Sequence, residues 1–233
     1  YQTMITKLRN RILEVAYRDG MGHIPSALSI LDIVWTLYDK VMTKDDQFIL
    51  SKGHGCMALY AVLEEKGLLD WSTKLMGHPK RDGKHILAST GSLGHGLPMA
   101  VGLAKAKKIK GESGRVFCLI GDGECNEGTT WESAMLASHH KLDNLVVIVD
   151  RNQSSDRALS VGSLVKKFDA FDFWSFGVSN DEIVNYEGFP ILDSKKPHVL
   201  VVHTLKGNGV PLMQSVEWHN RKLTKEDYEK CLS

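Results

Sequence analysis

The chain has 233 residues, of which 42% are hydrophobic and 24% charged, a composition typical of an ordinary globular protein. A formal net charge of +1 gives no basis for broad electrostatic binding to nucleic acid or to an acidic membrane. The four cysteines form no Cys-x-x-Cys pair and the apolar runs are too short to span a membrane, so we expect a reduced, cytoplasmic chain.

The first half of the sequence is predicted to be mostly helical. From Met4 to Asp19, hydrophobic residues recur at helical spacing, and Gly20 ends that segment. The elements expected next, in chain order, are a helix over Ala27–Lys40, a strand over Gln47–Leu50, and helices over Gly53–Lys66 and Gly94–Lys110.

The second half contains three apolar runs that predict strands: Val116–Ile120, Leu145–Val149 and His198–Thr204. A helix over Thr129–His140 lies between the first two, which predicts a βαβ unit with neighbouring parallel strands. We therefore expect an α/β fold, with a mostly parallel sheet, helices on both faces and one domain over residues 1–233. The segment Leu223–Ser233 is expected to be a polar tail.

Polar residues follow the predicted strands, at the sheet edge where open α/β sheets bind ligands. Gly121-Asp122-Gly123 follows the first of the three strands, and Asn152 follows the second. Glycines allow the backbone to approach a phosphate, and carboxylate and amide oxygens are suitable ligands for Mg²⁺. Gly-Asp-Gly alone is more often a simple turn. Its pairing with Asn152 favours a metal site bridged to a diphosphate.

The pairing of Gly121-Asp122-Gly123 with Asn152 resembles the signature of thiamine-diphosphate enzymes. The resemblance implies thiamine diphosphate as the cofactor, with Mg²⁺ (or Ca²⁺) bound by Asp122, Asn152 and the backbone carbonyl of Ser154. The commoner Asn-Asn ending of the signature is Arg151-Asn152 here.

Further segments, in the same order as in the family, resemble transketolase specifically. They extend over nearly the whole chain, from about Leu8 to His219, and comprise Gly22–Ser26, Ser51–His54, Gly77–Pro79, Ser89–Gly96, Lys206–Gly209 and Glu217–Asn220. The chain therefore resembles the diphosphate-binding domain of a transketolase.

The transketolase resemblance implies roles for individual residues. It implies that His23, His78 and His219 act on the sugar substrate, and imidazole suits this chemistry because it donates, accepts and titrates near neutral pH. An isolated histidine is more often a structural polar residue, and that alternative holds for each. The cofactor contacts implied by the resemblance are His54, Gly91, Ser92, Leu93, Gly121, Asp122, Gly123, Glu127 and Asn152.

Glu127 has two interpretations. The resemblance places it at a dimer interface, where it would link two cofactors through a network of carboxylates and water. Alternatively, it is simply an acidic residue at a helix N-terminus, where the helix dipole favours negative charge.

In transketolases, the glutamate that activates the cofactor, together with the arginine and serine that bind the sugar phosphate, comes from a second, pyrimidine-binding domain. This sequence shows no counterpart of that domain. We therefore expect the N-terminal subunit of a split transketolase, which transfers a two-carbon ketol unit between sugars or sugar phosphates in an α₂β₂ complex with a C-terminal subunit. The alternatives are a related enzyme with another donor, such as pyruvate, and a non-catalytic regulatory subunit.

One segment departs from the family pattern. The family reaches a Gly-His-Asp sequence after its Phe-Gly segment, whereas Phe176-Gly177 here runs almost directly to Asp181-Glu182. The sequence leaves open whether this loop is absent from the protein or omitted from the chain.

Overall fold

The computed structural model describes residues 1–185 and 195–232 and contains a five-stranded sheet in which every neighbouring pair is parallel. The strand order is β1-β2-β3-β5-β4. The strands are β1 (Gln47–Leu50), β2 (Val116–Gly121), β3 (Leu145–Arg151), β4 (Trp174–Ser179) and β5 (His198–His203). The predicted α/β class is confirmed.

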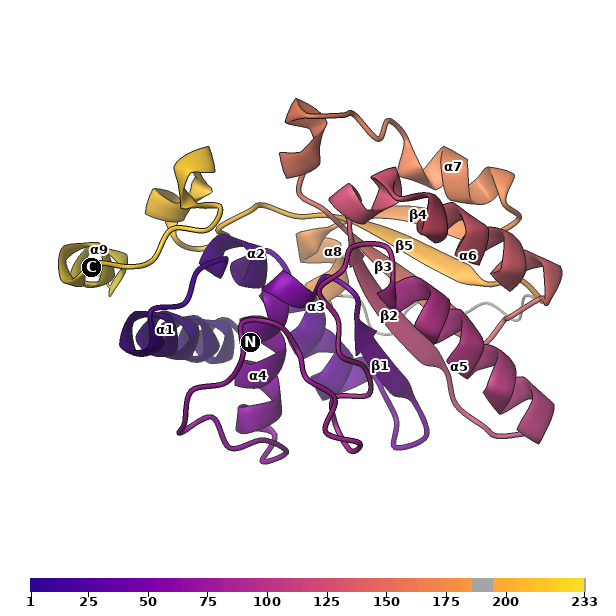
Figure 1. Ribbon diagram of the computed structural model, residues 1–233, viewed down its shortest axis with the longest axis horizontal. Coiled ribbons are helices and arrows are strands. Elements are labelled where there is room, and N and C mark those ends of the chain that lie inside the picture. The colour runs from indigo at the N-terminus through magenta and orange to yellow at the C-terminus, as the bar shows by residue number, and fades with distance from the viewer. Residues whose placement is uncertain (186–194, 233) are drawn as a thin grey trace.

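Helices cover both faces of the sheet (Figure 1). One layer consists of α1 (Gln2–Asp19), α2 (Ile24–Leu28), α3 (Leu31–Thr36), α4 (Cys56–Glu65) and α8 (Asn180–Asn185). The other consists of α5 (Gly96–Lys110), α6 (Gly128–His139) and α7 (Leu164–Ala170). Helix α9 (Lys225–Leu232) packs on α1. No helix in the described part of the chain is both long and apolar enough to cross a membrane.

The strand sequences explain why both faces are covered. Successive side chains of a strand point to opposite faces. In β2, Phe117 and Leu119 pack into the core beneath α1–α4, whereas Val116, Cys118 and Ile120 pack into the core beneath α5–α7. Such continuous apolar runs are typical of parallel strands buried on both sides.

The single helix expected over Ala27–Lys40 is wrong, because the segment is broken. Helix α2 ends at Leu28, α3 begins at Leu31, and a short π-helix follows over Leu37–Val41. At the break, the hydroxyl of Ser29 donates to the carboxylate of Asp150 in β3 at 2.8 Å. The break thus coincides with a contact to a distant strand, which hydrophobic spacing alone does not reveal.

Within the segment Leu223–Ser233, which was expected to be a polar tail, residues 225–232 form a helix, α9, that the sequence did not predict. The Thr224 hydroxyl accepts a hydrogen bond from the backbone N–H of Asp227, and the Asp227 carboxylate accepts one from that of Thr224, so the helix start is capped. The ring of Tyr228 stacks on Tyr17 of α1, with centroids 4.8 Å apart.

The edge strand β4 was not predicted. It contains the Phe176-Gly177 pair, and the chain passes directly from its last residue, Ser179, into α8. The run from Phe176 to Asp181 is thus a strand–helix junction. Residues 186–194, which follow it, lie outside the described part of the chain.

Candidate functional site

The carboxyl ends of four strands surround a cavity of about 320 Å³. Lys52 lies beyond β1, Asp122 beyond β2, Asn152 beyond β3 and Lys206 beyond β5. The predicted site residues in its wall are His23, His54, His78, Gly91, Leu93, Asp122, Gly123, Asn152, Ser154 and His219. The structure therefore brings the metal, cofactor and sugar candidates into one space.

Three predicted residues lie outside the cavity wall. Gly121 is the last residue of β2, directly before Asp122. The hydroxyl of Ser92 is 3.2 Å from the Nδ1 atom of His95. Glu127 is exposed and directly precedes α6. It therefore lies at a helix N-terminus, the position expected if it is an acidic residue favoured by the helix dipole.

Asp122 presents one carboxylate oxygen that accepts no hydrogen bond from the described residues. Its Oδ2 atom accepts hydrogen bonds from the Arg151 guanidinium at 3.1 Å and from the backbone N–H of Gln153 at 2.7 Å. Among the described residues, none donates a hydrogen bond to Oδ1. The side chain is buried and ion-paired with Arg151, so Oδ1 can bind a cation through a single oxygen.

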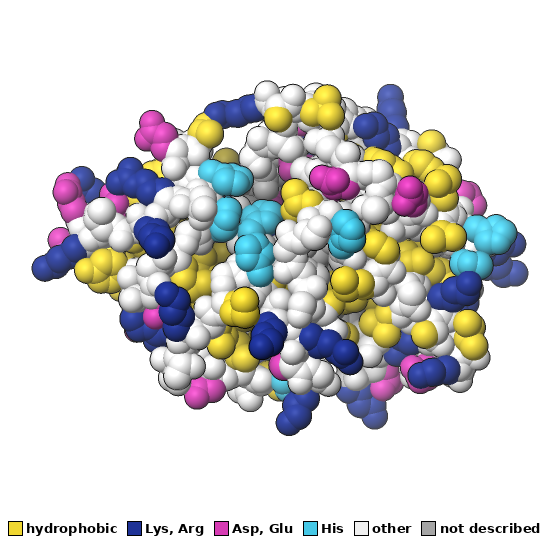
Figure 2. Space-filling view, in the orientation of Figure 1, with side chains coloured by type: hydrophobic (Ala, Val, Ile, Leu, Met, Phe, Trp, Pro, Cys, Tyr) yellow, Lys and Arg dark blue, Asp and Glu magenta, His cyan; other side chains and the backbone are white. Residues whose placement is uncertain are grey.

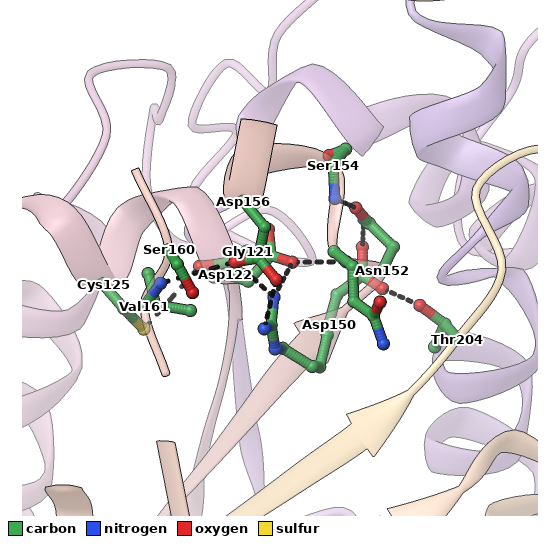
Figure 3. A network of polar contacts seen from close by, with 12 residues as sticks. Gly121, Asp122, Cys125, Asp150, Asn152, Ser154, Asp156, Ser160, Val161 and Thr204 are labelled. Atoms are coloured by element: carbon green, nitrogen blue, oxygen red, sulfur yellow. Dashed lines mark hydrogen bonds and ion pairs between the residues drawn. The ribbon is translucent and has the colours of Figure 1, made fainter. Parts of the chain in front are cut away.

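Asn152 is held at both ends of its amide group. Its NH₂ group donates to Asp150 at 2.8 Å, and its oxygen accepts from the backbone N–H of Ser154 at 3.0 Å (Figure 3). Because Gly121 of β2 pairs in register with Asp150 of β3, the loops that carry Asp122 and Asn152 leave the sheet side by side.

The donor set fits a hard cation. The described residues contain no group of three or more His, Cys, Asp or Glu side chains arranged to hold an ion by themselves. One carboxylate oxygen, one amide oxygen and a backbone carbonyl are suitable ligands for Mg²⁺, which commonly completes its coordination with phosphate and water.

Glycines allow the loops around the cavity to pack closely. A Cβ atom added to Gly53 would lie 2.8 Å from the carbonyl carbon of Thr90. Gly94 has a φ of +79°, and its added Cβ would lie 2.5 Å from the Thr129 hydroxyl. Larger residues at these two positions would push the Ser89–Gly96 segment away from its neighbours, so the glycines are required for the shape of the site.

A buried carboxylate that the sequence did not predict joins three of these segments. Glu124 is 1% exposed, and it accepts hydrogen bonds from the Ser51 hydroxyl at 2.5 Å and from the backbone N–H groups of Gly94 at 3.0 Å and Gly121 at 2.8 Å. Burial raises the pKa of Glu124, and the Ser51 hydrogen bond opposes this. An acidic residue at the third position of a helical turn is a recognisable capping signal, and it could have identified Glu124.

The sequence also did not predict a buried ion pair beneath the cavity. Lys52 is 2% exposed and its ammonium group contacts the carboxylate of Asp150. The same ammonium donates to the backbone oxygen of Ser26 at 3.0 Å and to the Ser29 hydroxyl at 2.9 Å. A buried lysine with this many partners fixes α2 against the end of β3.

The four histidines of the cavity are grouped around His23. Ring centroids lie 5.4 Å from His23 for both His54 and His219, and 6.4 Å for His78. Histidine side chains accordingly gather over the middle of one face in Figure 2. The backbone of His23 has a φ of 58°, which costs a residue with a side chain about 1–2 kcal/mol.

Hydrogen bonds define which ring nitrogen carries the proton in two of these histidines. Nδ1 of His23 is 3.0 Å from the backbone oxygen of His219 and must donate, because a carbonyl only accepts. The ammonium of Lys206 is 2.7 Å from Nδ1 of His219, which must therefore accept. The proton of neutral His219 is consequently on Nε2.

The surroundings keep these rings neutral. Burial lowers the pKa of His54 to about 2. Burial and the neighbouring His219 lower the pKa of His23. Partial burial and Lys206 lower the pKa of His219. At neutral pH these three rings are uncharged, and each offers one donor and one acceptor.

Residues 1–231 match the family model described as the thiamine-diphosphate-binding domain of transketolase. The chain belongs to the transketolase family.

Two relatives from this family have nearly the same length as the chain, and both are named as subunits. The apulose-4-phosphate transketolase subunit from Phocaeicola vulgatus is 36% identical, and the match covers 97% of this chain and 90% of the relative. The 6-deoxy-6-sulfo-D-fructose transketolase subunit SqwG of a Clostridium species is 33% identical, with 97% and 92% covered.

Other transketolases are much longer. Human transketolase is 34% identical, and the match covers 97% of this chain but 40% of the human protein. The crystal structure of Campylobacter jejuni transketolase has a TM-score of 0.84 and 25% identity, with 98% of this chain and 41% of that one covered. The chain thus spans about 40% of the length of these transketolases.

The matches confirm the predicted transketolase family, its thiamine-diphosphate-binding domain and the class of enzyme, a transferase of ketol units. The roles of individual site residues stay predictions.

Proposed function

We propose that this chain is the cofactor-binding subunit of a split transketolase. With its partner it transfers a two-carbon ketol unit from a ketose or ketose phosphate to an aldose or aldose phosphate. The observation that carries the proposal is the shared cavity, in which the oxygen donors of Asp122 and Asn152 face the same space as four histidine rings. Two relatives of similar length that are named as transketolase subunits support it.

In this proposal residues 1–233 form one diphosphate-binding domain. Asp122, Asn152 and the carbonyl of Ser154 hold Mg²⁺, with Ca²⁺ as a substitute, and the backbone of Gly121–Gly123 faces the diphosphate. The segment Gly91–Leu93 contacts the middle of the cofactor. Thiamine diphosphate supplies the carbanion chemistry of ketol transfer when bound, while the protein positions it and manages protons.

The sugar binds on the histidine side of the cavity. His23, His78 and His219 are the proposed catalytic residues, and His54 also approaches the diphosphate. A neutral imidazole can both donate a proton to a sugar oxygen and accept one from it. The Nε2–H of His219 is a defined donor, and Nε2 of His23 is a defined acceptor, because the other nitrogen of each ring is already engaged.

A partner subunit would cover the apolar surface of α5 and α6, which shows as hydrophobic side chains on that part of the molecule in Figure 2. Met99, Met135 and Leu136 are 45%, 52% and 51% exposed there, and Leu93 of the cofactor loop is 37% exposed. Obligate interfaces are rich in such residues. The proposed partner is the C-terminal, pyrimidine-binding subunit in an α₂β₂ complex, acting in the cytoplasm, and Glu127 lies beside this surface.

The test is ketol transfer from a panel of ketose donors by the purified chain, alone and mixed with the pyrimidine-binding subunit. The mass in solution is measured in parallel. We expect turnover only in the mixture, together with the mass of a heterotetramer. Equal turnover by the chain alone would contradict the division into subunits. Binding of the partner without turnover on any donor would favour a regulatory subunit.

A further inference from the structure

The side chain of Asn152 has two ends that differ in chemistry, and the structure fixes which end faces which neighbour. A carboxylate accepts hydrogen bonds, so the Asn152 group that contacts Asp150 is the NH₂. A backbone N–H only donates, so the group that contacts Ser154 is the oxygen. Both contacts favour the same orientation of the amide (Figure 3).

Asp150 is itself rigidly held. Its side chain is fully buried, and its Oδ2 atom accepts from Lys52 and from Ser29, the latter at 2.8 Å, as well as from Asn152. Its other oxygen accepts from the hydroxyl of Thr204, directly after β5. Four side chains from separate parts of the chain therefore converge on one carboxylate that cannot rotate.

We propose that Asp150 is a positioning residue for the metal site. By binding the NH₂ of Asn152, it turns the amide oxygen toward the ion that the site would hold. A hard cation binds oxygen and is repelled by an amide NH₂ group, so a flipped Asn152 would remove one of the protein's ligands. The inference rests on the proposed role of Asn152 as a metal ligand.

The first test removes the carboxylate without leaving the buried Lys52 cation unpaired. Replacing Asp150 alone would bury the Lys52 cation without a counter-charge, and the variant could unfold for that reason. The double variant Lys52→Met, Asp150→Leu replaces the ion pair with apolar side chains of similar size. Mg²⁺ binding to the full chain in the presence of thiamine diphosphate is measured by calorimetry, with circular dichroism as the check on folding.

We expect the double variant to fold and to bind Mg²⁺ about 10–100-fold more weakly, the range typical for loss of a partner that orients a metal ligand. Thr204→Val is the matched control, because it removes a different partner of Asp150 and leaves the contact with Asn152 intact. Its affinity should stay within a factor of about two of the parent. Parental affinity in the folded double variant would overturn the proposal.

A rescue distinguishes orientation from general disruption. In the double variant, Asn152 is further replaced by Asp, whose two ends are both oxygen, so that either orientation presents a ligand. We expect Mg²⁺ affinity to return to within about 10-fold of the parent. If the triple variant binds as weakly as the double variant, Asp150 does not act through the orientation of residue 152.

Asp122→Ala separates this inference from the proposed function. It removes the charged ligand and should abolish Mg²⁺-dependent cofactor binding. If it binds normally, the metal assignment itself is wrong. If it fails to bind while the double variant binds like the parent, only the role of Asp150 is wrong.

Discussion

His78 and His219 reach the cavity from loops, and backbone contacts help to hold both loops in place. His78 is exposed, and its loop is held through the backbone, where the hydroxyl of Tyr60 donates to the His78 carbonyl oxygen at 3.0 Å. His219 contacts His23 through its own backbone oxygen, at 3.0 Å. Loss of either imidazole therefore leaves these backbone contacts in place, and His219→Ala also loses the contact of its ring with Lys206.

At the residue scale, we predict that His78→Ala and His219→Ala retain cofactor binding but lose turnover. Loss of one positioned proton-transfer group typically lowers the rate about 10²–10⁴-fold. Steady-state rates of the assembled complex and calorimetric binding of thiamine diphosphate with Mg²⁺ are the measurements. His85→Ala, outside the cavity, is the control. Rates within a factor of about two of the parent would make these histidines structural.

At the scale of elements, Glu124 joins the segment after β1, the loop before α5 and the end of β2. We predict that Glu124→Ala lowers the free energy of unfolding by about 1–3 kcal/mol or more, because it leaves buried N–H groups of Gly94 and Gly121 without an acceptor. It should also weaken cofactor binding, since both segments face the cofactor in the proposed function.

Urea unfolding and calorimetry are the measurements. Glu124→Gln is a graded variant, because its amide keeps one acceptor oxygen, and it should lose less stability than Glu124→Ala. Glu132→Ala on the exposed face of α6 is the matched control and should change stability by less than about 0.5 kcal/mol. Equal stability of the parent and Glu124→Ala would show that the loops are held by other contacts.

Much of the element order was predictable from local pattern. The apolar run Val116–Ile120 and the following Gly121-Asp122-Gly123 identify a buried strand and the turn after it, and β2 has almost those bounds. The break between α2 and α3 was not predicted, because the hydrophobic spacing runs through it and the contact of Ser29 there is with Asp150, far away in the sequence. Helix α9 has a polar sequence, and its packing on α1 depends on Tyr228 meeting Tyr17.

The residues of the candidate site also fall into those that the sequence predicted and those that it did not. Motif residues that face the cavity, such as Asp122 and His54, were identified from the sequence because their chemistry is exposed to a ligand. Glu124, Lys52 and Asp150 were missed, because their function is to hold other segments and their partners lie on distant elements. A single sequence shows the type of each residue but not which distant residue it contacts.

At the scale of the whole molecule, His54 couples stability to pH. Its pKa is about 2 in the fold, against an ordinary value of 6.5, because burial disfavours the charged ring. Between these two values the unfolded chain binds one more proton than the folded chain at this site. His54 therefore has no proton-linked effect on stability above about pH 6.5, and it destabilises the fold progressively as the pH falls toward 2.

We predict that the free energy of unfolding falls on acidification below pH 6.5, with His54 contributing at most about 1.4 kcal/mol per pH unit. Urea unfolding at pH 7, 6 and 5 is the measurement. His54→Asn should show a shallower pH dependence than the parent, and His139→Asn, at the exposed end of α6, is the matched surface control. Identical slopes for the parent and His54→Asn would contradict the assigned ionisation.

The register between β2 and β3 places Gly121 opposite Asp150 through backbone hydrogen bonds alone. The two loops that carry Asp122 and Asn152 are consequently ordered when the sheet forms, and their conformational entropy is lost during folding. Binding of an ion therefore does not require these two loops to become ordered. The speed of loading should then follow how quickly each ion sheds its own water shell, so that Ca²⁺ enters faster than the slowly dehydrating Mg²⁺.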